Sequence, residues 1–158
     1  MKKSDVKIIS HLRTNGRMQL TDLSRKTGLP VSTIHERLKH LVEQKLLRPT
    51  MLLNFEKTGF ASQAYILLGV DQKDKDKLFS FLRSCDHVNS LFRINNGCNI
   101  LMHCIFKDMH DLENFMESIE TTYLIRQKQV HYVLDEVKLE QFFAQPAFAQ
   151  QLIGDAKV

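Results

Sequence analysis

Apolar residues recur at helical spacing through the first third of the chain. The helices predicted there span residues 4–14, 20–27 and 31–44. In the third helix, Ile34, Leu38 and Leu41 stand at i, i+4 and i+7, so one of its faces is apolar. Residues 46–55 follow as a β-prone segment, which Pro49 confines to an edge strand or a bulge.

Beyond Gly59 the pattern alternates between strand-like and helix-like segments. The predicted strands span residues 63–70, 87–95, 99–106 and 126–138, and the predicted helices span residues 74–85 and 108–121. Asn95, Asn96 and Gly97 form a strong hairpin signal, because tight turns need residues that tolerate positive φ. The order βαββαβ predicts an α+β sandwich of four antiparallel strands with two helices on one face.

Two apolar surfaces of the predicted protein need something to cover them. Tyr65 and Leu67 point to one face of the first strand of the sheet. Ile66 and Leu68 point to the other face, whereas the helices cover one face alone. We therefore expect the open face to bury against a second subunit. Residues 140–158 are also too apolar for a free tail, so part of them is expected to dock.

Composition and charge indicate a globular protein with a basic start. Of the chain, 43% is hydrophobic and 25% is charged, as in ordinary folded proteins. Residues 1–50 hold 11 Lys and Arg against 4 Asp and Glu, a net charge of +7, and the remainder holds 11 against 14, a net of −3. This asymmetry favours a nucleic-acid-binding module at the N-terminal side. No apolar run reaches the roughly 20 residues of a membrane span, so no membrane partner is expected.

The basic third also carries the spacing of a helix-turn-helix. Ser24 lets two helices approach, Gly28 makes the tight turn between them, and Ile34 anchors the second helix. That helix exposes hydroxyl and charged groups, which bond base edges and phosphates. A trihelical core with a solvated basic face is the alternative. We predict double-stranded DNA as the partner, with these contact residues: Ser32, Thr33, Glu36, Arg37, Lys39 and His40.

Together these residues resemble the Lrp/AsnC (leucine-responsive, feast/famine) family of transcription regulators. The matching motifs are Asp5-x-x-Ile8-Ile9-x-x-Leu12, Asn15-Gly16-Arg17, Leu23, Gly28-Leu29, Ser32-Thr33-Ile34-x-x-Arg37-Leu38-x-x-Leu41, Leu46-Leu47 and Gly59. The resemblance implies a winged helix-turn-helix with its linker strand at residues 1–55. It further implies a ferredoxin-like ligand-sensing and oligomerisation (RAM) domain at residues 60–138, before a C-terminal tail at residues 139–158. Dimers that assemble into tetramers or octamers are implied as well.

The resemblance also implies an effector site at the turn between the second and third strands of the RAM domain. Family members bind amino acids or related small molecules there, and this chain offers Gly97, Cys98 and Asn99. Many relatives carry an aspartate in a Gly-x-Tyr-Asp run, whereas Ile100 stands at the end of that run here. The carboxylate that bonds an ammonium group is therefore missing, and the Asn99 amide is left as an acceptor.

The sequence predicts no metal, no cofactor and no catalytic residues. Cys85, Cys98 and Cys104 make an odd count without CxxC spacing, which favours free thiols and a reducing cytoplasm. His103 and Cys104 are adjacent on a strand, so they point to opposite faces and cannot share an ion. Glycine-rich phosphate loops and nucleophile–base arrangements are missing from the sequence.

One class of enzyme stays open as the alternative. Sirohaem decarboxylases resemble the Lrp/AsnC family in layout, and they need a tetrapyrrole pocket rich in His and Arg. His87, Arg93, His103 and His131 fall in the strand-rich half of this chain, which is where such a pocket would form. A third hypothesis is an oligomerising adaptor that binds neither DNA nor tetrapyrrole.

Overall fold

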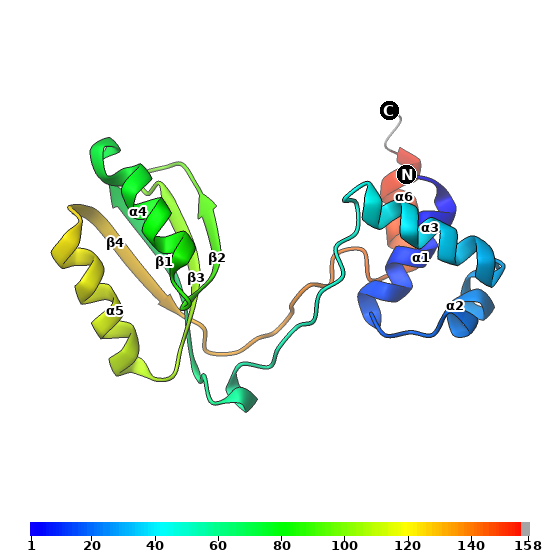
Figure 1. Cartoon of the computed structure of the whole chain (residues 1–158), viewed down its shortest axis with the longest axis horizontal. Helices are drawn as coiled ribbons and strands as arrows, with labels where there is room; N and C mark the ends of the chain where they lie inside the picture. The colour runs from blue at the N-terminus through cyan, green and yellow to red at the C-terminus, as the bar shows by residue number, and fades with distance from the viewer. Residues whose placement is uncertain (156–158) are drawn as a thin grey trace. The chain divides into compact units, whose positions relative to one another are not determined.

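The computed structural model describes residues 1–155, which divide into two compact units (Figure 1). Met1–Leu52 and the described residues after Glu136 form the first, which we call the helical unit. Leu53–Glu136 forms the second, which we call the sheet unit. Within residues 1–155, no helix is long and apolar enough to cross a membrane.

The helical unit is built on the three predicted N-terminal helices. They are α1 (Lys3–Thr14), α2 (Leu20–Thr27) and α3 (Val31–Glu43). Each contributes one residue to a core cluster, namely Ile8, Leu23 and Ile34, all with no exposed surface. The helical spacing of apolar residues in the sequence therefore predicted these elements correctly, and it did so because each helix buries one stripe of its surface.

Left-handed residues end both α2 and α3. Gly28 has φ 72° at the end of α2, and the hydroxyl of Ser24 donates to the carbonyl oxygen of Leu29 (2.6 Å) across the turn. This is the tight turn expected from the helix-turn-helix spacing. Lys45 follows α3 with φ 57°, although it is not a glycine. A side chain in this conformation costs about 1–2 kcal/mol relative to a right-handed one.

The segment after α3 differs from the prediction. Residues 44–61 contain no strand, so the predicted edge strand at residues 46–55 is wrong. The segment runs without regular structure into a single 3-10 turn, η1 (Glu56–Thr58). Met51, Leu52 and Leu53 are largely exposed. A β-prone sequence forms a strand where another strand pairs with it, and none pairs with this segment.

The sheet unit has the predicted βαββαβ order. Its elements are β1 (Ser62–Val70), α4 (Gln72–Ser84), β2 (Val88–Arg93), β3 (Ile100–Phe106), α5 (Met109–Thr122) and β4 (Ile125–Tyr132). All strand pairs are antiparallel, in the order β2-β3-β1-β4. Ile66 and Met102 of the sheet share one core cluster with Leu82 of α4 and Leu112 of α5, so both helices pack on the same face. Asp108 caps α5, since its carboxylate accepts from Asp111 N (2.9 Å).

The last strand is shorter than predicted. β4 ends at Tyr132, which pairs with Ala64, and Val133 N donates to Gln63 O (2.9 Å) as the last bond of the ladder. β1 begins at Ser62, so the chain beyond has no strand to pair with. Leu134 is 96% exposed accordingly. The prediction that this strand continues to residue 138 is wrong, because the length of its partner sets its end.

The C-terminal segment returns to the helical unit and packs on α1 as α6 (Pro146–Asp155) (Figure 1). The Arg13 guanidinium donates to the carbonyl oxygens of Glu140 (2.5 Å) and Phe142 (3.1 Å) and to the Glu140 carboxylate (2.7 Å). Ala149 of α6 has no exposed surface, whereas Ala147 is exposed. The expected docking of the tail is confirmed, and α1 is the helix that receives it.

This docking predicts unequal effects of two substitutions on α6. Ala149→Glu places a carboxylate where no surface is exposed, so we expect the free energy of unfolding of the helical unit to fall by about 2 kcal/mol. Ala147→Glu, on the exposed side of the same helix, is the control and should change it by less than about 0.5 kcal/mol. Urea unfolding followed by circular dichroism measures both. Equal stability of the two variants would contradict the docking.

Candidate functional site

The exposed side of α3 gathers most of the predicted DNA contacts. Ile34 and Leu41 lie on the opposite side and are buried. The residues on the outer side follow one another at intervals of three and four, which places them along one stripe. We call it the outer stripe of α3, and it consists of Ser32, Glu36, Lys39 and His40, all exposed, with half-buried Thr33 at its edge.

The start of α3 is open to an anion. Pro30 is the N-cap residue and has no side-chain hydroxyl to cap the helix. The bond from Ile34 N to Pro30 O (3.0 Å) is the first of the helix, and the amides before it have no acceptor within the helix. Such amides, at the positive end of the helix dipole, are suited to a phosphate group. Ser32 and Thr33 add two hydroxyl groups in the same turn.

The positive charge of Lys39 in the outer stripe is only weakly paired. The Lys39 ammonium is 72% exposed and lies 3.9 Å from the Glu43 carboxylate one turn along. Exposed pairs of this kind contribute about 0.5 kcal/mol, so the ammonium group is readily exchanged to another anion. A phosphate can therefore compete for Lys39.

Arg37, the one predicted contact outside the outer stripe, is placed differently. Its side chain lies against α1, where Nε and Nη2 donate to the two carboxylate oxygens of Asp5 (both 2.7 Å). The sequence reasoning grouped Arg37 with the outer stripe because of its charge. The signal against this was available, since Arg37 stands three residues after Ile34 and four before Leu41, both core positions.

The turn predicted to bind an effector is held in place by hydrogen bonds to the end of β1. Gly97 has φ 89°, so the positive φ expected there is confirmed. The Asn99 amide donates to Val70 O (2.7 Å) and accepts from Val70 N (3.2 Å), which ties the turn to the end of β1. Cys98 is buried, with Sγ 3.8 Å from Oε1 of Gln127. Both the oxygen and the nitrogen of the Asn99 side-chain amide are therefore bonded to the backbone of Val70.

Two glycines bring three segments into close contact at this turn. A Cβ on Gly69 would lie 3.0 Å from the carbonyl oxygen of Gly97 and 3.0 Å from Cβ of Gln127. A Cβ on Gly97 would lie 3.0 Å from Oε1 of Gln127. The residues that complete this site, Gly69, Val70 and Gln127, were missed by sequence reasoning, because cross-strand register brings them together and no sequence pattern marks it.

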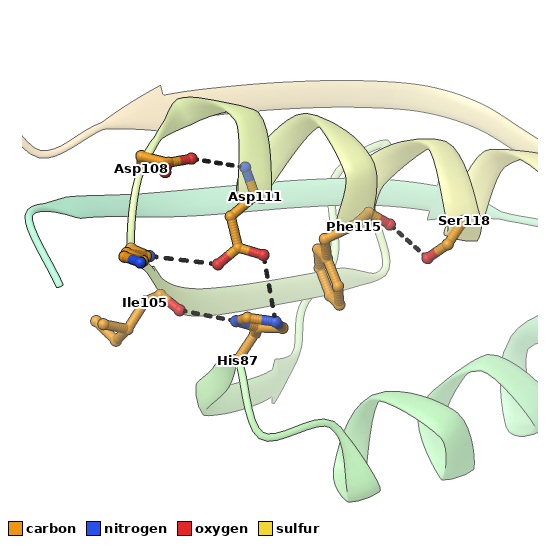
Figure 2. A network of polar contacts seen from close by, with 7 residues as sticks. His87, Ile105, Asp108, Asp111, Phe115 and Ser118 are labelled. Atoms are coloured by element: carbon orange, nitrogen blue, oxygen red, sulfur yellow. Dashed lines mark hydrogen bonds and ion pairs between the residues drawn. The ribbon is translucent and has the colours of Figure 1, made fainter.

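His87 belongs to a separate polar network at the start of α5 (Figure 2). The carbonyl oxygen of Ile105 accepts from its Nδ1 (3.2 Å), and its Nε2 lies 3.7 Å from the Asp111 carboxylate. Its ring stacks on Phe106, with 4.9 Å between the centroids. These contacts connect β3 to α5, so the imidazole contributes to packing of the sheet unit.

The remaining residues of the tetrapyrrole hypothesis lie on two different faces of the sheet. Tyr65 pairs across the sheet with both His103 and His131, and its ring stacks on His103 at 4.5 Å. Burial lowers the pKa of His103, which keeps it neutral. Arg93 instead lies over the ring of Phe79 (4.6 Å), on the helix-covered side. The four residues therefore do not share one pocket.

The cysteines and histidines are the residues considered above for a metal site or a disulfide. Residues 1–155 bring together no three His, Cys, Asp or Glu side chains that could hold a metal ion. Cys85, Cys98 and Cys104 are free thiols. Burial, with Cys85 nearby as the lesser cause, raises the pKa of Cys104 to about 12, so this thiol is unreactive at neutral pH.

Two family models match the chain. A winged helix-turn-helix DNA-binding model covers residues 1–48, and an Lrp/AsnC ligand-binding domain model covers residues 63–141. The HTH-type transcriptional regulator FL11 of Pyrococcus furiosus is 28% identical over 143 residues, which is 86% of this chain and 95% of that protein. The similarity therefore extends over both units.

Solved structures of transcription regulators are similar to this chain as well. A transcriptional regulator of Neisseria meningitidis, solved as its L-Met complex, has a TM-score of 0.80 and 26% identity over 88% of this chain and 93% of its own. AsnC of E. coli has a TM-score of 0.77 over 88% and 95% of the two chains. At 18% identity, this second likeness shows the fold alone.

The bonds of Asn99 predict a role in stability. Asn99→Ala removes the donor and the acceptor that bond Val70, so the free energy of unfolding of the sheet unit should fall by about 1–3 kcal/mol. Asn95→Ala, exposed in the same turn, is the control and should change it by less than about 0.5 kcal/mol. Urea unfolding and hydrogen exchange of the Val70 amide measure the effect. An unchanged exchange rate of the Val70 amide in Asn99→Ala would show that the bonds between Asn99 and Val70 do not stabilise the sheet unit.

Proposed function

The chain belongs to the Lrp/AsnC family of DNA-binding transcription regulators, and we propose that it reads duplex DNA with the outer stripe of α3. Members of this family are regulators and not enzymes, so the sirohaem decarboxylase alternative is set aside. One observation supports the assignment of α3 above the others. This second helix of the helix-turn-helix buries Ile34 and Leu41 and leaves a continuous polar stripe exposed on a basic unit.

The chemistry of the stripe suggests a division of roles. Ser32 and Thr33 are short and lie at the helix start, where hydroxyl and backbone N–H groups bond phosphates or base edges. Glu36 can accept from the amino group of cytosine in the major groove. Lys39 and His40 lie further along and supply charge to the phosphate backbone. We propose these five residues as the DNA contacts.

These roles predict different effects of two kinds of substitution. Duplexes selected from a random pool by the full chain provide the ligand. With that duplex, Lys39→Ala should weaken binding and reduce the slope of log K against log salt by about 0.9, because one phosphate contact is lost. Ser32→Ala should change the preferred sequence and leave the slope as it is. Lys77→Ala, an exposed lysine on α4, is the control.

Fluorescence anisotropy over a range of salt concentrations gives the slopes, and a repeated selection gives the preferences. Wild-type affinity, slope and preference in every variant of the outer stripe would show that α3 is not the recognition element.

We propose that the protein dimerises through the open face of its sheet. Phe92, Leu101 and Leu67 form one cross-strand row on that face, and Phe92 is 50% exposed. Tyr65 lies in the next row and is also exposed. A row of partly exposed apolar residues across three strands favours burial against a second copy. A two-fold dimer presents two α3 helices, so the selected site should be close to palindromic, and tetramers or octamers are further assemblies of such dimers.

The proposed interface predicts that Phe92→Asp weakens the dimer. The carboxylate would have to be desolvated between two sheets, so the dissociation constant of the dimer should rise at least about tenfold. Met109→Asp, equally exposed but at the start of α5, is the control and should leave it unchanged. Light scattering on the full chain across protein concentrations measures both. A monomeric wild-type protein, or a Phe92→Asp variant that dimerises normally, would contradict the interface.

We further propose that the Gly97, Cys98 and Asn99 turn senses an amino acid or a related small molecule. Support comes from the match of residues 63–141 to a ligand-binding domain and from the relative of Neisseria meningitidis, which was solved with L-Met. The Asn99 amide is bonded to Val70 at both ends, so ligand contacts fall to the backbone of the turn and to Gln127. Three free thiols fit a protein that works in the cytoplasm.

A further inference from the structure

The pair between Asp5 and Arg37 joins α1 to α3 by a fork of two parallel bonds. Nε donates to Oδ1 and Nη2 donates to Oδ2, both at 2.7 Å, across 32 residues of sequence. Asp5 is 3% exposed, and the side chain of Arg37 is 20% exposed. A bidentate pair of this kind constrains the relative orientation of its two groups as well as their distance.

Asp5 is itself held in place by α1. Lys2 N donates to its Oδ2 (2.8 Å), which closes the first turn of the helix. The carboxylate therefore belongs rigidly to α1, and it offers Arg37 a fixed point of attachment. Removal of Arg37 would leave a buried charge with its main partner gone.

The other contacts that hold α3 in the core are apolar. The cluster of Ile8, Leu23 and Ile34 is apolar, and apolar burial is non-directional. A rotation of α3 by a small angle would move the outer stripe relative to the rest of the unit. The fork from Arg37 to Asp5 adds a directional contact that opposes such a rotation.

We propose that Arg37 is a positioning residue of the DNA-binding unit and that it does not contact DNA. It sets the rotation of α3 on α1, and through that rotation it sets which base edges Ser32, Glu36 and Lys39 reach. This inference rests on the proposed function of the outer stripe and reassigns one of its predicted residues.

Substitution of Asp5 distinguishes positioning from direct contact. Asp5→Asn raises the net charge by one, so a purely electrostatic effect would strengthen DNA binding. Positioning predicts instead that Asp5→Asn and Arg37→Gln both reduce the ratio of affinities for the selected and a scrambled duplex. We expect a reduction of about tenfold, within the range seen for one mismatched base pair. The salt slope should stay unchanged in both variants, and Lys39→Ala is the matched control whose slope falls.

The double variant completes the cycle. The effects of substituting the two partners of one contact are not additive. The double variant, Asp5→Asn with Arg37→Gln, should therefore have an affinity ratio no lower than that of the poorer single variant. All measurements are made well below the unfolding transition of each variant, where a loss of stability alone cannot change the ratio. If Arg37→Gln does not fold, Asp5→Asn and the double variant still decide the question. Unchanged or stronger selective binding by Asp5→Asn, with a shallower slope in Arg37→Gln, would make Arg37 a DNA contact.

A structural measurement separates this inference from the proposed function. If the wild-type protein selected no duplex, the proposed function would fail. Amide chemical shifts would then test whether the pair of Asp5 and Arg37 positions α3. Asp5→Asn should shift resonances along the whole of α3, whereas shifts confined to the neighbourhood of residue 5 would overturn the inference.

Discussion

The helical unit depends on one buried carboxylate, that of Asp5. Its core cluster is small and apolar, and a unit of this size buries a limited fraction of its surface. Ser10 and Thr27, the other buried polar residues described in this unit, donate to carbonyl oxygens of their own helices (both 2.7 Å). Asp5 alone among these three bonds a different helix. Packing therefore brings the helices together, and the pair with Arg37 orients α3.

The sheet unit differs from the helical unit in that its strands present two apolar faces and a hydrogen-bonded turn. Alternation along β1 and β3 sends one set of side chains into the core beneath α4 and α5 and the other set to the open face. The turn at Gly97 is then tied to the end of β1 by the Asn99 amide. The chain leaves β4 at Tyr132 and re-enters the helical unit after Glu136, where Arg13 anchors it. Two stretches of chain thus connect the units, and each unit keeps its own core.

The sequence predicted the elements well where burial on one face decides them. The bounds of α2 followed from the spacing of its apolar residues and from Gly28 after it. The edge strand at residues 46–55 and the end of β4 were wrong, because a strand needs a partner and the sequence does not state where that partner begins. Arg37 was assigned by its charge, although its position relative to Ile34 and Leu41 puts it at the edge of the core. Gln127 and Val70 lie at the Gly97 turn because of the strand register, which leaves no mark on the sequence.

A crystal structure of the protein bound to its selected duplex tests the central claim most directly, since it shows the side chains of α3 against DNA. We expect the Arg37 guanidinium to remain on Asp5, with the outer stripe at Ser32 and Lys39 against the duplex. A guanidinium on a base edge or a phosphate, with the Asp5 carboxylate released, would contradict the account.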